Sequence, residues 1–227
     1  MGKVLYTRKG APKPTRYSGV ELGAIAEGNI VWLNENGAPV EFYVAKHDYE
    51  SELNGAGRTL LVRKDCYDYR PWGSSAGNVY VISDIDLWLN GEYKNLLDPI
   101  VQEAIKETTI VCTKRYGKAG LTTVTRAVFL LSVAELGKAS STTNNTEGTT
   151  LPIAGTLGTA LYNGAEAHFW TRSPNTSNAG SVWARRTGNV FGTHDASFDS
   201  NVASRPCITL PATALFDENT MAFKGVL

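Results

Sequence analysis

The chain has 227 residues, and its 22 lysines and arginines balance 22 aspartates and glutamates, so the formal net charge is zero. This length allows one large domain or two small ones, and it suffices to bury a core without disulfides or metal ions. Proteins that bind nucleic acid over their whole surface are strongly basic, so the neutral balance argues against that class. With 22 glycines and 10% aromatic residues, the composition predicts a globular protein with many turns and excludes a disordered one.

We interpret residues 1–24 as a basic N-terminal arm, because residues 1–20 contain five basic residues, two prolines and no acidic residue. The arm either attaches the protein to a larger assembly or an anionic partner, or is a loosely ordered terminus. We find no apolar stretch of membrane-spanning length and no apolar region of a secretory signal peptide. We therefore expect a protein that is made in a cytoplasm and either stays there or leaves by assembly and lysis, without membrane insertion.

In the first part of the chain, apolar and β-branched runs bounded by turn residues predict strands. We expect a hairpin of residues 30–33 and 40–45 around a turn at 34–37, followed by a strand at 59–64. Residues 66–80, rich in tyrosine, glycine and serine, predict a long loop.

Two helices are expected next. Ser83 and Asp86 form a start resembling a capping box, in front of apolar residues that share one helical face. Asp98 followed by Pro99 predicts an N-cap with proline in the first turn of a helix at residues 100–106.

Short strands are then predicted at residues 109–112 and 127–131. Ser132 and Glu135 form a capping box that Gly137 closes, which predicts a short helix between them.

The second half is rich in turn residues. The run of serine, threonine and asparagine at 139–150 predicts a solvated surface loop, and short strands are expected at 169–172, 181–185, 189–191 and 206–210. The predicted order along the chain is strands, then helices, then strands again. This order predicts an α+β fold with short antiparallel strands, two main helices and long loops.

The common catalytic motifs are absent from the sequence: we find no phosphate loop, dinucleotide fingerprint, nucleophile elbow or H-E-x-x-H pair. The three histidines are scattered, and Cys66, Cys112 and Cys207 are too widely spaced for a metal pair, so we expect buried free thiols and no metal or cofactor. A cysteine nucleophile and a histidine base that meet only in space stay open as an alternative.

Trp183 begins a stretch in which aromatic and basic residues are interleaved, W-A-R-R. Such a stretch suits either a stacking platform for single-stranded nucleic acid or a buried tryptophan on a strand. The neutral net charge favours the second, so we expect no nucleic-acid partner.

Four phrases occur in order along the chain: residues 86–93 (DLWLNGEY), 128–132 (VFLLS, followed by Glu135), 169–174 (FWTRSP) and 205–210 (RPCITL). Together they resemble a domain family of unknown function that is common in Gram-positive bacteria and their prophages, and the resemblance covers about residues 25–217. The family is similar to the C-type-lectin-like fold of formylglycine-generating enzymes and of the variable proteins of diversity-generating retroelements. This chain has Thr171, Ser204 and Cys207 where leucine, glycine and alanine are usual.

The resemblance implies a C-type-lectin-like domain at residues 25–217, followed by a C-terminal tail at 218–227. It implies a non-enzymatic protein of the phage tail or its host-recognition end, which binds a glycan or protein of the bacterial surface. Other phage tail proteins are the expected partners, and a homo-oligomer is expected because particle proteins commonly use symmetric contacts.

In such a fold, ligands bind to the loops before the last core strand. Here these loops, residues 175–180 and 192–203, are rich in adaptable hydrogen-bonding residues, although an ordinary solvated loop is the alternative. We expect Arg172 and Arg205 to be structural, since the guanidinium fork can hold several loop carbonyls together. The expected ligand-binding residues are His194, Asp195, Phe198, Asp199 and Asn201, with Trp183 and Arg185 beneath them.

Two alternatives to this function stay open. The first is a binding protein diversified by a retroelement, with residues 175–203 as its variable region. The second is a cryptic enzyme of the formylglycine-generating type, which would need a close cysteine pair for copper. The motifs of calcium-dependent sugar-binding lectins, E-P-N or Q-P-D with W-N-D, are absent from the sequence.

Overall fold

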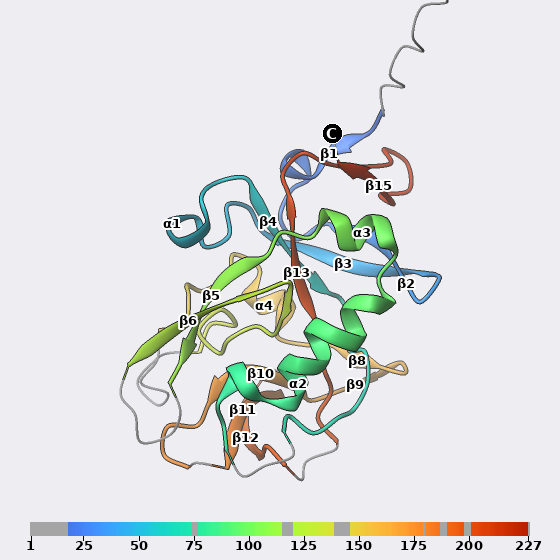
Figure 1. Ribbon diagram of the computed structural model, residues 1–227. Coiled ribbons are helices and arrows are strands. Elements are labelled where there is room, and N and C mark those ends of the chain that lie inside the picture. Colours follow the sequence, from blue (N-terminus) through green and yellow to red (C-terminus); the bar gives the residue numbers. More distant parts are fainter. Residues whose placement is uncertain are drawn as a thin grey trace, which may run out of the picture.

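The computed structural model describes residues 18–73, 77–114, 120–138, 146–178, 180–186, 190–197 and 201–226. Short antiparallel strands and a few short helices make up this part of the chain, which confirms the predicted α+β class (Figure 1). Among these residues, no helix is both long enough and apolar enough to cross a membrane.

The largest sheet has five strands in the order β2-β3-β4-β13-β7, and each neighbouring pair is antiparallel. Strand β13 therefore lies between β4 and β7, although it is formed near the end of the chain. Its residues are all buried, so both faces of the sheet are covered at this point. The strands are β2 (Ile30–Glu35), β3 (Ala38–Lys46), β4 (Arg58–Arg63), β7 (Val128–Phe129) and β13 (Cys207–Pro211).

The hairpin of β2 and β3 is confirmed, and its turn consists of Asn36 and Gly37. Both residues have positive φ angles, 52° and 76°, which is the conformation that a two-residue hairpin turn requires and that Asn-Gly adopts most readily.

A helical segment follows one side of this sheet and contains α2 (Asp84–Trp88), the π-helical turn η3 (Leu89–Tyr93) and α3 (Pro99–Ala104). Both predicted N-caps are present. The Ser83 hydroxyl accepts a hydrogen bond from the Asp86 amide, and the Asp98 carboxylate accepts one from the Ile100 amide.

Asn90 attaches this helical segment to the central sheet. Its amide group donates to the carbonyls of Val128, at 2.9 Å, and Asp86, at 3.0 Å. Its carbonyl oxygen accepts from the amides of Ala127 and Val128. One side chain therefore fixes the position of β7 relative to the helix.

A second sheet, β10-β11-β12, lies at one end of the molecule, next to α2 (Figure 1). A third, β1-β14-β15, lies at the opposite end. The strands are β1 (Val20–Glu21), β10 (Phe169–Pro174), β11 (Ser181–Arg186), β12 (Val190–Asp195), β14 (Ala214–Phe216) and β15 (Phe223–Val226). A separate hairpin contains β5 (Thr108–Thr113) and β6 (Leu121–Arg126). The other elements are η1 (Leu22–Ala24), α1 (Ser51–Asn54), η2 (Tyr80–Ile82), η4 (Lys94–Leu96), α4 (Ala154–Leu157), β8 (Leu161–Tyr162) and β9 (Ala165–Glu166).

Strands outside both of the expected domain boundaries pair with β14, which lies inside them. Residues 20–24, assigned to the arm, contain β1 and the fully buried Leu22, and β1 pairs with β14. The expected tail at 218–227 contains β15, which pairs with β14 on its other edge. The part of the arm before residue 18 lies outside the described residues.

The short helix expected between Ser132 and Glu135 is wrong. The reciprocal capping-box hydrogen bonds are present, from the Glu135 amide to the Ser132 hydroxyl and from the Ser132 amide to the Glu135 carboxylate. However, Gly137 has a φ of 82°, and the Lys138 amide already donates back to Val133. The capping box that would begin a helix and the glycine that would end it are only a few residues apart, so the segment forms a turn and not a helix.

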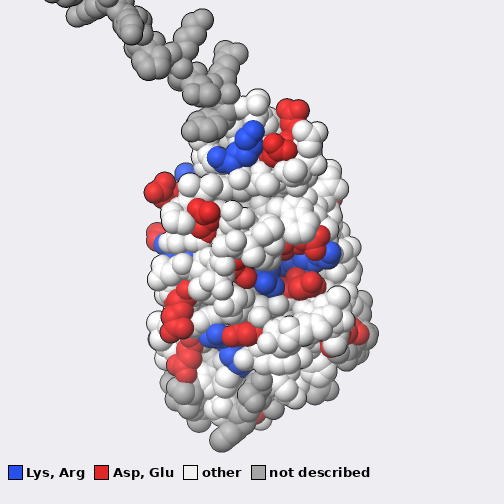
Figure 2. All heavy atoms as spheres, turned by 90° about the vertical axis from the view of Figure 1, so that its right-hand side faces the viewer, with Lys and Arg blue, Asp and Glu red and all other residues white. Residues whose placement is uncertain are grey.

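Charged side chains of both signs are mixed on the surface rather than separated. On the face shown in Figure 2, blue and red atoms lie next to one another without a broad basic area. Some of the chain's exposed charges form ion pairs, such as Lys64 with Glu41 at 2.6 Å. This surface agrees with a net charge of zero.

We expect Asn90→Ala to destabilise the protein by about 3 kcal/mol, because it leaves several partly buried backbone groups without a partner. Urea denaturation measures the change in the free energy of unfolding. Asn95→Ala is the matched control, since Asn95 is exposed and its side chain has no hydrogen bond within the described residues. Equal stabilities of the two variants would contradict the role of Asn90.

Candidate functional site

The sheet β10-β11-β12 carries most of the predicted ligand-binding residues, but it divides them between its two faces. Arg185 lies opposite Phe191 in the register, and His194 lies opposite Val182. Because successive side chains of a strand point to opposite faces, Trp183 and Arg185 share one face and His194 lies on the other.

His194 belongs to the inner face. It is buried, and its ring lies 5.4 Å from that of His168 and 5.9 Å from that of Trp170. His194 therefore lies on strand β12 and not in a loop, because the strand continues through residue 195, beyond the last apolar residue of the sequence pattern. Its expected role in ligand binding stays a prediction.

Asp195 and Asn201 lie at the surface as expected. The Asp195 carboxylate accepts hydrogen bonds from the amide and the hydroxyl of Ser197, at 2.9 and 2.8 Å, which stabilises the turn after β12. Phe198 and Asp199, the other two predicted contacts, lie outside the described residues.

On the outer face, Trp183 and Arg185 meet a lysine that sequence analysis missed. Lys138 Nζ lies 4.4 Å from the centre of the Trp183 ring and 5.1 Å from that of Phe191. Arg185 Cζ lies 4.2 Å from the same Phe191 ring. We call these four residues the cationic cluster. Lys138 follows Gly137 in the mispredicted turn, and its position depends on that turn.

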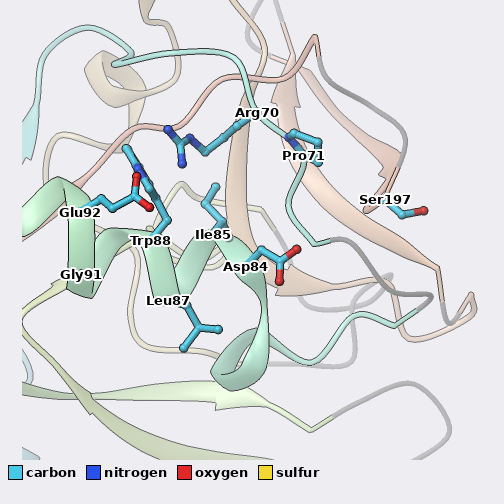
Figure 3. A pocket seen from close by; sticks show the side chains of 9 residues that line it. All are labelled: Arg70, Pro71, Asp84, Ile85, Leu87, Trp88, Gly91, Glu92 and Ser197. Carbon is cyan, nitrogen blue, oxygen red and sulfur yellow. The ribbon is translucent and has the colours of Figure 1, made fainter.

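A groove of about 670 Å³ runs beside helix α2, close to the turn after β12 (Figure 3). Helix residues form one wall, and the segment of Arg70 and Pro71 forms the other. The lining residues are Arg70, Pro71, Asp84, Ile85, Leu87, Trp88, Gly91, Glu92 and Ser197.

A rigid stack forms one end of this groove. Arg70 Cζ lies 3.1 Å from the centre of the Trp88 ring, and Tyr67 and Tyr93 pack against the same ring at 5.5 and 5.3 Å. The Arg70 guanidinium is also bonded to the Asp68 carboxylate. A cation held both by a ring and by a carboxylate has little rotational freedom.

Ser204 connects this stack to the last core strand. Its hydroxyl donates to Asp68 at 2.8 Å, and Asp68 holds Arg70. Ser204 therefore contributes to the orientation of Arg70 in the groove.

Asp84 and Glu92 are the acidic residues that line the groove, and both are exposed. Within the described ranges, the carboxylates of Asp84 and Glu92 make no hydrogen bond or ion pair. Leu87 lies between them with 63% of its surface exposed. The groove thus offers two free acceptors on either side of an apolar ridge. Sequence analysis predicted the helix but assigned no role to its outer face.

Arg172 and Arg205 are both buried and hold several segments together. Arg172 is fully buried and donates to both oxygens of Glu135, at 2.7 and 2.9 Å, and to the carbonyls of Leu130 and Val111. Arg205 donates to the carbonyls of Arg63, Lys64 and Leu157 at 2.6–2.9 Å.

Glu147 belongs to the same buried network as Arg172, although it lies in the run that we expected to be a solvated loop. It is fully buried, accepts from the Thr113 amide at 2.6 Å, and is bonded to the Ser173 hydroxyl. Burial raises the pKa of this carboxyl group above its usual value, despite the nearby Arg172. The expectation of a solvated residue is therefore wrong for Glu147, since the neighbouring polar residues gave no sign of a buried acid.

The cysteines are buried free thiols, as expected. Burial raises the pKa of Cys66 and Cys112 to about 12 and that of Cys207 still further. Thiols with such pKa values stay protonated at neutral pH and are weak nucleophiles and metal ligands. Within the part of the chain that the structure describes, no three histidine, cysteine or acidic side chains are grouped so that they could hold a metal ion.

Residues 56–212 match a family described as a domain of unknown function, DUF6273. No curated protein and no solved structure matches the chain at a significant level.

We expect Glu147→Gln to change how stability depends on pH. The raised pKa means that the folded state binds the proton more tightly than the unfolded state. The contribution of Glu147 is therefore fully present below its unfolded pKa and is lost as the pH rises through its folded pKa. Glutamine does not titrate, so the stability of the variant relative to the wild type should rise as the pH increases above the usual glutamate pKa of about 4.3.

Urea denaturation at several pH values measures this difference. Glu103→Gln is the control, because Glu103 is exposed and its side chain has no hydrogen bond within the described residues. A difference between Glu147→Gln and the wild type that stays constant or falls with pH would contradict the assignment.

Proposed function

We propose that this chain, which belongs to the DUF6273 family, is a non-enzymatic ligand-binding protein of a phage or prophage particle, with a C-type-lectin-like fold. In this proposal it lies in the tail or its host-recognition end and binds a glycan or protein of the bacterial surface. The family match covers residues 56–212, which include the helical segment, β10-β11-β12 and β13.

The positions of the four resembled phrases support the proposed fold. They form the helical segment α2–η3, the strand β7 with the turn after it, strand β10 and strand β13. Buried residues from each of them, such as Leu89, Phe129, Trp170 and Ile208, contribute to one core. The phrases therefore belong to a common scaffold.

One observation carries the proposed function: the groove and the polar turn after β12 lie together at one end of the molecule. Ser197 belongs to both of them, since it lines the groove and bonds to Asp195 in the turn. The first described residues and the C-terminal strand lie at the other end (Figure 1). We call the end with the groove the recognition end.

The groove has the chemistry of a recognition site. Apolar surface from Leu87 and Pro71 lies beside a fixed guanidinium and two free carboxylates. Ligand sites commonly combine an apolar surface with a few oriented polar groups. Hydroxyl and amino groups of a surface glycan, or the polar side chains of a surface protein, are suited to such acceptors and donors.

The opposite end suits attachment to the particle. Strand β1 begins there, directly after the basic residues 1–17. A basic segment at this end is suited to an acidic surface of another tail protein or of a second copy of the chain. Attachment at one end leaves the recognition end accessible.

We expect Leu87→Ser to weaken binding to isolated envelopes of the bacterium that carries the gene by about tenfold or more, because Leu87 is the exposed apolar centre of the groove. Sedimentation with labelled protein measures the affinity. Leu53→Ser is the matched control, since Leu53 is 45% exposed on α1, far from the recognition end (Figure 1). Unchanged binding by Leu87→Ser, with the fold intact, would refute the groove as the site.

We also expect the protein to be a component of particles released after prophage induction. Mass spectrometry of particles purified on a density gradient detects it, with a cytoplasmic enzyme of the host as the control for carry-over. The particle assignment fails if the chain stays in the cell lysate while the tail proteins are found in the particle fraction.

A further inference from the structure

The arginines of this chain show what a buried guanidinium normally requires. Four of those described pair with a carboxylate, Arg63 with Glu35, Arg70 with Asp68, Arg126 with Asp86 and Arg172 with Glu135. Arg205 has no carboxylate within bonding distance among the described residues, but three carbonyls accept its hydrogen bonds. Each of these guanidinium groups therefore has carboxylate or carbonyl partners within the protein that offset the cost of burying its charge.

Arg185 is the exception. Only 5% of its surface is exposed, and its one hydrogen bond runs from Nε to the Gly158 carbonyl at 3.1 Å. Its two terminal nitrogens bond to no residue that the structure describes. A cation removed from water without an anionic partner is costly. In agreement with this, burial lowers the pKa of Arg185.

A second cation of the cationic cluster shares this property. Lys138 Nζ is partly buried over the rings of Trp183 and Phe191, and across the described ranges it makes no ion pair or hydrogen bond. The indole Nε1 of Trp183 is itself buried without a hydrogen-bond partner. Two cations without an anionic partner among the described residues, and an indole N–H without an acceptor there, thus lie on the outer face of one sheet.

These groups are complementary to a doubly charged anion. A single carboxylate neutralises only one of the two cations, whereas a phosphate monoester or two neighbouring phosphodiesters supply two negative charges. Phosphate oxygens also accept from guanidinium, ammonium and indole N–H groups, and the bonds to the two cations are charge-assisted.

We propose that Lys138, Trp183 and Arg185 form a binding site for the phosphate groups of a polyol-phosphate polymer. The site itself follows from the uncompensated cations, and the identification of its ligand as a cell-surface polymer rests on the proposed function. This phosphate site is separate from the groove, because no residue of the cationic cluster lines the groove.

The charge of the chain favours this source of phosphate over nucleic acid. Because residues 1–20 carry five basic residues and no acidic one, the rest of the chain has five more acidic than basic residues. Such a body repels a long polyanion except at a local cationic site, whereas a nucleic-acid-binding protein presents a broad basic surface.

Calorimetric titration of the full chain tests the site with three probes: poly(glycerol phosphate), inorganic phosphate and polyglutamate. We expect poly(glycerol phosphate) to bind with a salt-dependent affinity, inorganic phosphate to bind more weakly and to compete, and polyglutamate not to bind. Lys138→Gln and Trp183→Phe should each weaken polymer binding, Lys138→Gln by about tenfold.

Matched variants separate the site from a general loss of charge or fold. Lys106→Gln removes one positive charge from an exposed lysine away from the sheet and should bind like the wild type. Trp183→Phe keeps an aromatic ring for Lys138 while removing the N–H donor. Arg185→Lys keeps the positive charge but loses the guanidinium fork, so its affinity for the polymer should lie between that of the wild type and a complete loss of binding.

The outcomes distinguish this inference from the proposed function. No binding of either phosphate probe, equal binding of polyglutamate, or equal loss in Lys106→Gln would overturn the phosphate site. Tighter binding of single-stranded DNA than of poly(glycerol phosphate) would overturn the polymer assignment. If the phosphate site fails while Leu87→Ser still abolishes envelope binding, the proposed function stands without it.

Discussion

The ion pair of Arg172 and Glu135 is the interaction on which the rest of the structure depends. Both residues are fully buried, and their bonds join β10, β5, the end of β7 and the segment around Glu147. Tyr49, which precedes α1, donates to the same carboxylate at 2.5 Å. A buried pair of this kind stabilises only when every lone pair and proton is used, and removing one partner leaves a buried charge. The loops between these segments are free to vary because their ends are fixed here.

The recognition end contains two surfaces that differ in charge, and both adjoin the segments that this ion pair holds together. The groove has free carboxylates beside an apolar ridge, and the cationic cluster has free cations over aromatic rings. Both include residues from positions far apart in the sequence, such as Arg70 with Glu92 and Lys138 with Phe191. In the proposed function, two chemically different surfaces would contact separate features of the same target.

Local signals allowed much of the fold to be predicted. The Asn36-Gly37 turn, the Ser83 cap and the Asp98-Pro99 helix start each depend on a few neighbouring residues, and all are present. Long-range effects were not predictable in this way. Nothing near Glu147 shows that Thr113 and Ser173 will enclose it, and nothing near Lys138 shows that it will cover Trp183. The sites therefore depend on tertiary contacts that no local pattern contains.

The central place of β13 has a consequence for how the chain is made. Until residues 207–211 have left the ribosome, β4 and β7 have no common neighbour, and each presents an unpaired strand edge. The large sheet is therefore completed only after residues 207–211 have been synthesised, with contacts of very long sequence separation, which slow folding. During this interval the open edges are prone to pair with other chains.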